Sequence, residues 1–336
     1  MTTALKPPSS ATTSINIDIF RTLLAQWVII GHVAPSVLNI PAVPGRMAVW
    51  CFFIISGFLN AQSFSNRLGK ESWLAATRHY YISRAKRIYP LLILNYCVVS
   101  LFLGSWVNDE WYVFFPYLHS FKGTLSNSVL WTLVIEIQLY ILTPLLIIIA
   151  GRLRNLHWMV QLLPGLLLAY GVPKLHAFLG NNPDLIDDRT VSGNIGFYFF
   201  GMMLAIGIAK RGSFTPRVDL ALRYLLLIAT AYLLYRYNTS FFGIQFTQGP
   251  AVAVLASFLV LSALTPLLAG GHRIFRLLGY YTYEIYILHG LLAFIWHELK
   301  FTSATSIVFF WWAMPLILVL IFDVTVKKKY RDLKPQ

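Results

Sequence analysis

The sequence predicts an all-α protein that crosses a membrane many times, as a bundle of about ten transmembrane helices. Of its 336 residues, 57% are hydrophobic and only 12% are charged, whereas about 25% of the residues in a soluble domain are charged. Apolar runs follow one another along the whole chain, and many approach the roughly 20 residues that a helix needs to span a bilayer. No polar stretch between them is long enough to form a separate soluble domain.

Ten apolar segments account for the expected helices, and polar, basic or turn-forming stretches separate them. In chain order they are approximately 16–38, 47–66, 89–106, 128–150, 158–176, 193–209, 219–237, 250–269, 279–298 and 305–326. The aromatic segment 107–127 is expected to form an interfacial loop or a re-entrant piece. This division gives a cytoplasmic tail of residues 1–14, a membrane domain of residues 15–326 and a basic cytoplasmic tail of residues 327–336.

The basic residues predict the orientation. The formal net charge is +14, but the basic residues cluster in short loops between apolar segments, which indicates membrane topology rather than nucleic-acid binding. With the N-terminus in the cytoplasm, 21 of the 27 Lys and Arg residues lie on the cytoplasmic side, most densely in the loop 67–88. The six on the outer side are Arg46, Lys122, Lys174, Arg189, Arg236 and Lys300. The positive-inside rule therefore predicts that both termini are cytoplasmic.

Ionisable side chains inside the expected helices are the first candidates for function, because a charge within the bilayer is costly. Arg21 and His32 both lie in the first segment, and the eleven-residue step between them corresponds to about 16 Å along a helix. Arg21 is thereby placed near the cytoplasmic end, and His32 in the outer half of the membrane. Glu136, in the fourth segment, is expected at a depth similar to that of His32.

Six short motifs follow one another along the chain. They are Arg21-x10-His32, Phe52–Phe58, Arg84–Pro90, Trp131–Tyr140, Phe199–Ala205 and Leu278–His289. In order and spacing they resemble the acyltransferase-3 family of integral membrane O-acyltransferases, from about residue 14 to residue 326. That family modifies bacterial surface glycans, lipopolysaccharide O-antigen, lipo-oligosaccharide signals and some macrolide sugars. Two positions depart from its pattern, since Ile137 replaces a frequent second acid and Glu284 a frequent serine.

The resemblance implies an enzyme of a bacterial inner membrane that uses acetyl-CoA to acylate a hydroxyl of a cell-surface glycan or lipid-linked sugar. It implies that His32 is the catalytic base and that Arg21 helps to hold acyl-CoA. Transfer to a hydroxyl requires a base, for which histidine is suited, and a group that orients this base, for which Glu136 is the candidate. Arginines bind phosphates through several donors, so Arg21, Arg84 and Arg87 are expected to hold the CoA phosphates.

Four further residues are expected along the substrate path: Trp131, Tyr283, Tyr286 and His289. No metal is expected. Each assignment has a structural alternative: His32 and His289 as packing residues, Glu136 as a structural partner, Arg21 as a snorkelling side chain, Arg84 and Arg87 as topology determinants, and Trp131 as an interfacial anchor. The pair Ser56-Gly57 predicts a close approach between helices, as small residues allow in membranes.

Two other functions stay open. A proton-coupled transporter would use His32, Glu136 and Glu284 as a relay and would consume no acyl-CoA. Alternatively, the chain moves only the acyl group outward and passes it to a partner protein.

Overall fold

The computed structural model describes residues 10–38, 45–103, 128–179, 190–210, 221, 224–232, 249–262 and 272–324. Within these ranges the chain is helical almost throughout and contains no strand. The helices are α1 (Ser10–Leu38), α2 (Arg46–Leu68), α3 (Trp73–Leu103), α4 (Trp131–Leu153), α5 (Trp158–Leu179), α6 (Val191–Lys210), α8 (Gly249–Ser262), α9 (His272–Tyr280), α10 (Thr282–Glu298), α11 (Ala304–Ile307) and α12 (Met314–Phe322). A 3-10 turn, Ser128–Leu130, precedes α4, and a π-helical segment, Val308–Ala313, joins α11 to α12.

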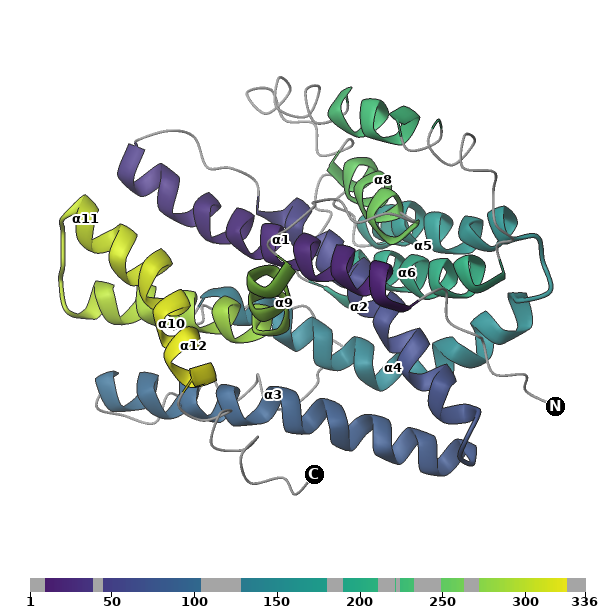
Figure 1. Cartoon of the computed structure of the whole chain (residues 1–336), viewed down its shortest axis with the longest axis horizontal. Helices are drawn as coiled ribbons and strands as arrows, with labels where there is room; N and C mark the ends of the chain where they lie inside the picture. The colour runs from purple at the N-terminus through teal and green to yellow at the C-terminus, as the bar shows by residue number, and fades with distance from the viewer. Residues whose placement is uncertain are drawn as a thin grey trace.

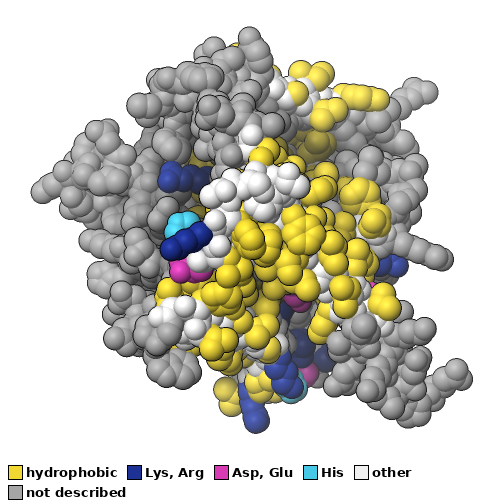
Figure 2. Space-filling view, turned by 90° about the vertical axis from the view of Figure 1, so that its left-hand side faces the viewer, with side chains coloured by type: hydrophobic (Ala, Val, Ile, Leu, Met, Phe, Trp, Pro, Cys, Tyr) yellow, Lys and Arg dark blue, Asp and Glu magenta, His cyan; other side chains and the backbone are white. Residues whose placement is uncertain are grey.

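The predicted all-α membrane class is confirmed. In the described ranges, five helical stretches are long and apolar enough to cross a bilayer: Arg46–Leu68, Trp73–Leu103, Trp131–Leu153, Val191–Ala209 and Ala304–Phe322. Figure 2 shows one face on which hydrophobic side chains form a broad area, with most charged side chains at its margin. Such a surface suits contact with lipid chains rather than water. The number of ten helices and the cytoplasmic position of both termini stay predictions.

Helices α2, α4, α5 and α6 pack together as one group (Figure 1). Helix α6 packs against α2 on one side and α5 on the other, while α1 lies across this group and contacts α2, α8, α9 and α10. Helix α3 runs along one edge and reaches α2, α4 and α10. As a result, the first four helices, α1 to α4, and α10, which is distant from them in sequence, converge on one region.

Glycines allow the close contact between α2 and α6. A Cβ atom on Gly57 would overlap the carbonyl oxygen of Tyr198, and one on Gly201 would overlap the carbonyl oxygen of Ile54. The two backbones therefore meet at positions where only glycine fits, as is common between membrane helices. The close approach predicted at Ser56-Gly57 is thus found at Gly57.

Helix α3 begins earlier than the sequence predicted. We expected a loop over 67–88, but the helix begins at Trp73 and continues through Pro90. Tyr80 explains the difference: its side chain is fully buried, and its hydroxyl donates to Thr143 Oγ1 at 3.0 Å. One face of this basic segment therefore packs on the bundle, and Arg84 and Arg87 lie on a helix rather than in a loop.

The end of the chain also differs in detail from the expected helices. The segment 279–298 contains the end of α9 and all of α10, which are separated at Tyr281. The segment 305–326 is helical over its described part but includes the π-helical stretch. The expected loop 107–127 lies outside the described residues, as does much of the segment 219–237, whose residues 224–232 are helical.

Candidate active site

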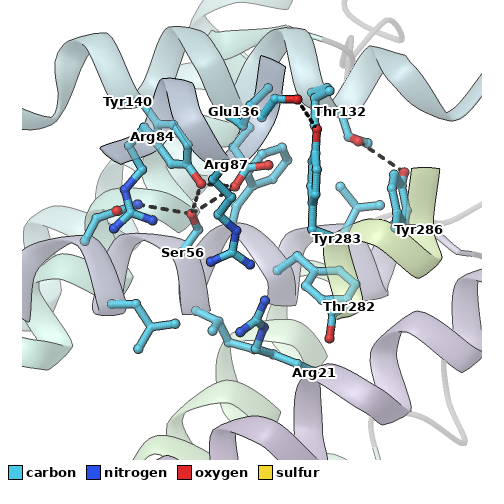
Figure 3. Close-up of a pocket in the computed structure, with 18 residues that line it drawn as sticks. Arg21, Ser56, Arg84, Arg87, Thr132, Glu136, Tyr140, Thr282, Tyr283 and Tyr286 are labelled. Atoms are coloured by element: carbon cyan, nitrogen blue, oxygen red, sulfur yellow. Dashed lines mark hydrogen bonds between the residues drawn. The ribbon is translucent and has the colours of Figure 1, made fainter. Parts of the chain in front are cut away.

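The five converging helices enclose a cavity of about 110 Å³ (Figure 3). Much of its wall is apolar and comes from α2, α3 and α4, including Val49, Phe52, Phe53, Ile55, Leu59, Ile88 and Leu133. The polar residues on its wall are Arg21, Ser56, Asn60, Arg84, Arg87, Thr132, Glu136, Tyr140, Thr282, Tyr283 and Tyr286. An apolar cavity with a few convergent polar groups is typical of a small-molecule site.

Three arginines and one carboxylate give this cavity an excess of positive charge. Arg21 comes from α1, Arg84 and Arg87 come from α3, and Glu136 comes from α4. Figure 3 shows the guanidinium groups of Arg21 and Arg87 pointing toward one another from opposite walls. Within the described part of the chain, none of the three arginines forms an ion pair. Like charges that face one another across a cavity favour an anionic ligand between them.

Arg84 has a different environment from the other two arginines. Its guanidinium carbon lies 5.4 Å from the centre of the Tyr80 ring and 5.5 Å from that of the Tyr140 ring. Both distances fit cation–π contacts, which hold the side chain without neutralising its charge. The Nε atom of Arg84 is buried and has no hydrogen-bond partner among the described residues. The described residues of the protein therefore leave this donor unsatisfied.

Glu136 is held by hydroxyl groups rather than by a close arginine. The Tyr140 hydroxyl, one helical turn further along α4, donates to its carboxylate. Ser56 Oγ donates to the same carboxylate oxygen at 3.4 Å, and Asn60 Nδ2 donates to Ser56 Oγ at 3.2 Å (Figure 3). Arg21 also interacts electrostatically with Glu136 and with Asp18, which is not part of the cavity wall. These neighbours orient the carboxylate and leave the arginine donors free.

At another part of the wall, α10 contributes two tyrosines. The Tyr283 hydroxyl donates to the Ile88 carbonyl oxygen at 2.9 Å, which ties α10 to the helix that carries Arg87. The Tyr286 hydroxyl accepts a hydrogen bond from Thr132 Oγ1 at 3.1 Å. Beyond Tyr286 lie the two histidines, since the His289 ring centre is 5.3 Å from that of Tyr286 and 5.7 Å from that of His32.

The structure divides eight of the nine predicted site residues into two groups. Arg21, Arg84, Arg87, Glu136, Tyr283 and Tyr286 line the cavity. His32 and His289 lie together beyond Tyr286, and His32 is exposed while His289 is buried. Trp131 is not among the cavity residues; its side chain packs against the main hydrophobic core.

The position of Glu136 differs from the expectation. The sequence placed it at a depth similar to that of His32, whereas in the described structure its hydrogen-bond partners are Ser56 and Tyr140 and its charge acts on Arg21. Depth counted along helix axes assumes upright, parallel helices. Membrane helices tilt, and packing between them decides which residues meet. Glu136 therefore lies in the same cavity as Arg21, although the number of residues along each helix had placed Arg21 near the cytoplasmic end and Glu136 at the depth of His32.

The polar residues Ser56, Asn60 and Tyr140 were not predicted as part of the site. Their spacing carries a signal that could have identified them. Ser56 and Asn60 are four residues apart in an apolar helix, and so are Glu136 and Tyr140, and side chains at this spacing share one helix face. A polar pair on one face of a membrane helix usually faces a cavity or a partner helix.

A family model described as an acyltransferase domain, acyltransferase-3, matches residues 14–326. This chain belongs to the acyltransferase-3 family. The protein is therefore a membrane acyltransferase that uses an acyl donor, which argues against a non-enzymatic transporter. No curated protein and no solved structure matches the chain. Among the described residues of this acyltransferase, no group of three or more His, Cys, Asp or Glu side chains is placed to hold a metal ion.

Proposed function

We propose that this acyltransferase transfers an acetyl group from cytoplasmic acetyl-CoA to a hydroxyl of a cell-surface glycan or lipid-linked sugar, in a bacterial inner membrane. The observation that carries the proposal is the cavity with three arginines that form no ion pair among the described residues. CoA is a polyanion, and guanidinium groups bind phosphates through several charge-assisted hydrogen bonds. The family supplies the reaction class, and this charge excess favours a phosphorylated donor.

The residues are assigned as follows. Arg21, Arg84 and Arg87 bind the phosphates of the donor, and Glu136 is a positioning residue that limits the repulsion among them. The apolar wall of the cavity accommodates the uncharged part of the donor. Tyr283 and Tyr286 line the route toward the histidines, and Trp131 supports the start of α4. His32 takes the proton from the acceptor hydroxyl, because imidazole is an effective base near neutral pH.

The exposed position of His32 supports this division of roles. An acceptor that arrives from outside the bundle reaches His32 without passing through the arginine-lined cavity. The acyl donor approaches from the cavity side, past Tyr286. The two substrates therefore use separate routes, which suits an enzyme whose donor and acceptor come from opposite sides of a membrane.

The test combines cells and purified protein. A deletion strain is complemented with the wild type, His32→Gln or His79→Gln; His79 is a matched control because it is exposed on α3 and pairs with Glu71. We expect mass spectra of surface glycans to show acetyl groups with the wild type and with His79→Gln, and none with His32→Gln at equal protein levels. Purified protein with labelled acetyl-CoA should then label a glycolipid fraction from the deletion strain.

Two results would contradict the proposal. Unchanged glycan acetylation in the deletion strain would refute a surface glycan as the acceptor. Acetylation that persists with His32→Gln would refute the assignment of His32 as the base. Consumption of labelled acetyl-CoA without labelled glycolipid would instead favour a partner protein that completes the transfer.

A further inference from the structure

His289 is a buried histidine whose polar atoms are not used by the fold. Its side chain is 1% exposed, and both ring nitrogens are buried without a hydrogen-bond partner among the described residues. The backbone carbonyls of Ile285 and Tyr286, on the preceding turn, are neighbours but do not meet hydrogen-bond geometry. A buried polar group without a partner costs about 1–3 kcal/mol. A ligand that supplies the missing partner would remove this cost.

The position of His289 indicates which ligand could supply the missing hydrogen-bond partner. Its ring lies between Tyr286, on the wall of the donor cavity, and His32, the proposed base. The ring centres of the two histidines are 5.7 Å apart, with an angle of 36° between their planes. A reacting carbonyl that came past Tyr286 would reach His289 on the cavity side and the hydroxyl held by His32 on the other.

We propose that His289 donates a hydrogen bond from its ring N–H to the carbonyl oxygen of the acyl thioester and stabilises the oxyanion formed during transfer. This assignment rests on the proposed function. The neutral imidazole carries one N–H, and no acceptor among the described residues competes for it. A fixed donor in a water-poor site is effective because it requires no reorganisation when charge develops.

The step balances with the residues present. The acceptor oxygen forms a bond to the carbonyl carbon as its proton passes to His32, and the carbonyl π electrons move to the oxygen that faces His289. These changes give a tetrahedral intermediate. Its collapse breaks the carbon–sulfur bond and releases CoA thiolate, which takes the proton from His32. The products are the acylated acceptor, CoA thiol and neutral His32, while His289 keeps its proton throughout.

The experiment compares substitutions at two histidines of the same helix. His289→Phe keeps the ring volume and removes the donor; His289→Asn and His289→Gln place an amide N–H near the positions of the two ring nitrogens. His297→Phe is the matched control, because His297 is exposed near the end of α10. Acetyl transfer from acetyl-CoA is measured with membranes of the deletion strain as the source of acceptor, and acetyl-CoA binding is measured in parallel.

We expect His289→Phe to lower kcat by about 100- to 1,000-fold, the range found for loss of one oxyanion donor, and to change acetyl-CoA affinity by no more than about threefold. One of the two amide variants should recover at least about tenfold of the loss, which a purely structural role for the ring would not allow. In the wild type, the infrared stretching frequency of a 13C-labelled acetyl carbonyl should fall on binding, and the fall should disappear in His289→Phe.

The assignment is overturned if His289→Phe turns over like the wild type, or if neither amide variant recovers activity. Should His289→Phe fail to fold, the wild-type carbonyl frequency decides: a value equal to that of free acetyl-CoA overturns the assignment. A wild-type protein that does not bind acetyl-CoA would refute the proposed donor and this role together. Normal wild-type turnover with an unaffected His289→Phe would refute only the role of His289.

Discussion

The three arginines of the cavity carry positive charges that no ion pair among the described residues neutralises. Arg84 is held over two tyrosine rings, Arg21 feels the charges of Asp18 and Glu136, and Arg87 faces Arg21 across the cavity. The carboxylate of Glu136 is turned toward Ser56 and Tyr140 instead of forming an ion pair. At the scale of single residues, the site is therefore built to receive negative charge rather than to neutralise itself.

This arrangement predicts that the arginines recognise the phosphates of the donor and not its acyl end. Arg21→Gln and Arg87→Gln should each weaken binding of acetyl-CoA about 10- to 100-fold, since a hydrogen bond to a charged group contributes about 1.5–3 kcal/mol. Binding of S-acetylpantetheine, which has no phosphate, should change by less than about twofold. Titration calorimetry of the purified variants measures both affinities.

Arg78→Gln is the control for this comparison, because Arg78 lies on the same helix as Arg87 and is likewise exposed but is not part of the cavity. It should bind both ligands like the wild type. Equal weakening of both ligands by Arg87→Gln would indicate a general distortion of the cavity and would refute phosphate recognition.

At the scale of elements, helix contacts decide which residues can reach the cavity. Because α3 begins at Trp73, Arg84 and Arg87 both lie on this helix. They are three residues apart, so their side chains share one helix face. The close packing of α2 on α6 positions the face of α2 that carries Ser56 and Asn60. Small residues at this contact therefore act on the site indirectly, through helix position.

The α2–α6 contact predicts opposite effects for two identical substitutions. Gly57→Ala adds a methyl group that overlaps the Tyr198 carbonyl oxygen, so it should destabilise the protein by about 1–3 kcal/mol or more. Gly151→Ala, in α4, meets no atom within 4 Å and should be neutral or stabilise the protein by up to about 1 kcal/mol. Unfolding in mixed detergent micelles measures both. Equal stability of the two variants would contradict the close helix contact.

At the scale of the whole molecule, the asymmetry of basic residues predicts the orientation in the membrane. Lys70 and Lys300 are both exposed and are expected on opposite sides. In a Cys97→Ser background, a membrane-impermeant maleimide should label Lys300→Cys in intact spheroplasts. It should label Lys70→Cys only after the membrane is opened. The native Cys51 is buried and should not react. The reverse pattern of labelling would invert the predicted topology.

The sequence alone determined the membrane class, the helical architecture and the family, because these depend on composition, apolar segment length and short motifs along the chain. It also identified six of the residues that line the cavity. The tertiary structure decided how the candidates are grouped: Glu136 with the arginines, and His32 with His289. Contacts among α1, α2, α3, α4 and α10 set these groupings. Such features arise from packing between distant segments, which a local pattern does not encode.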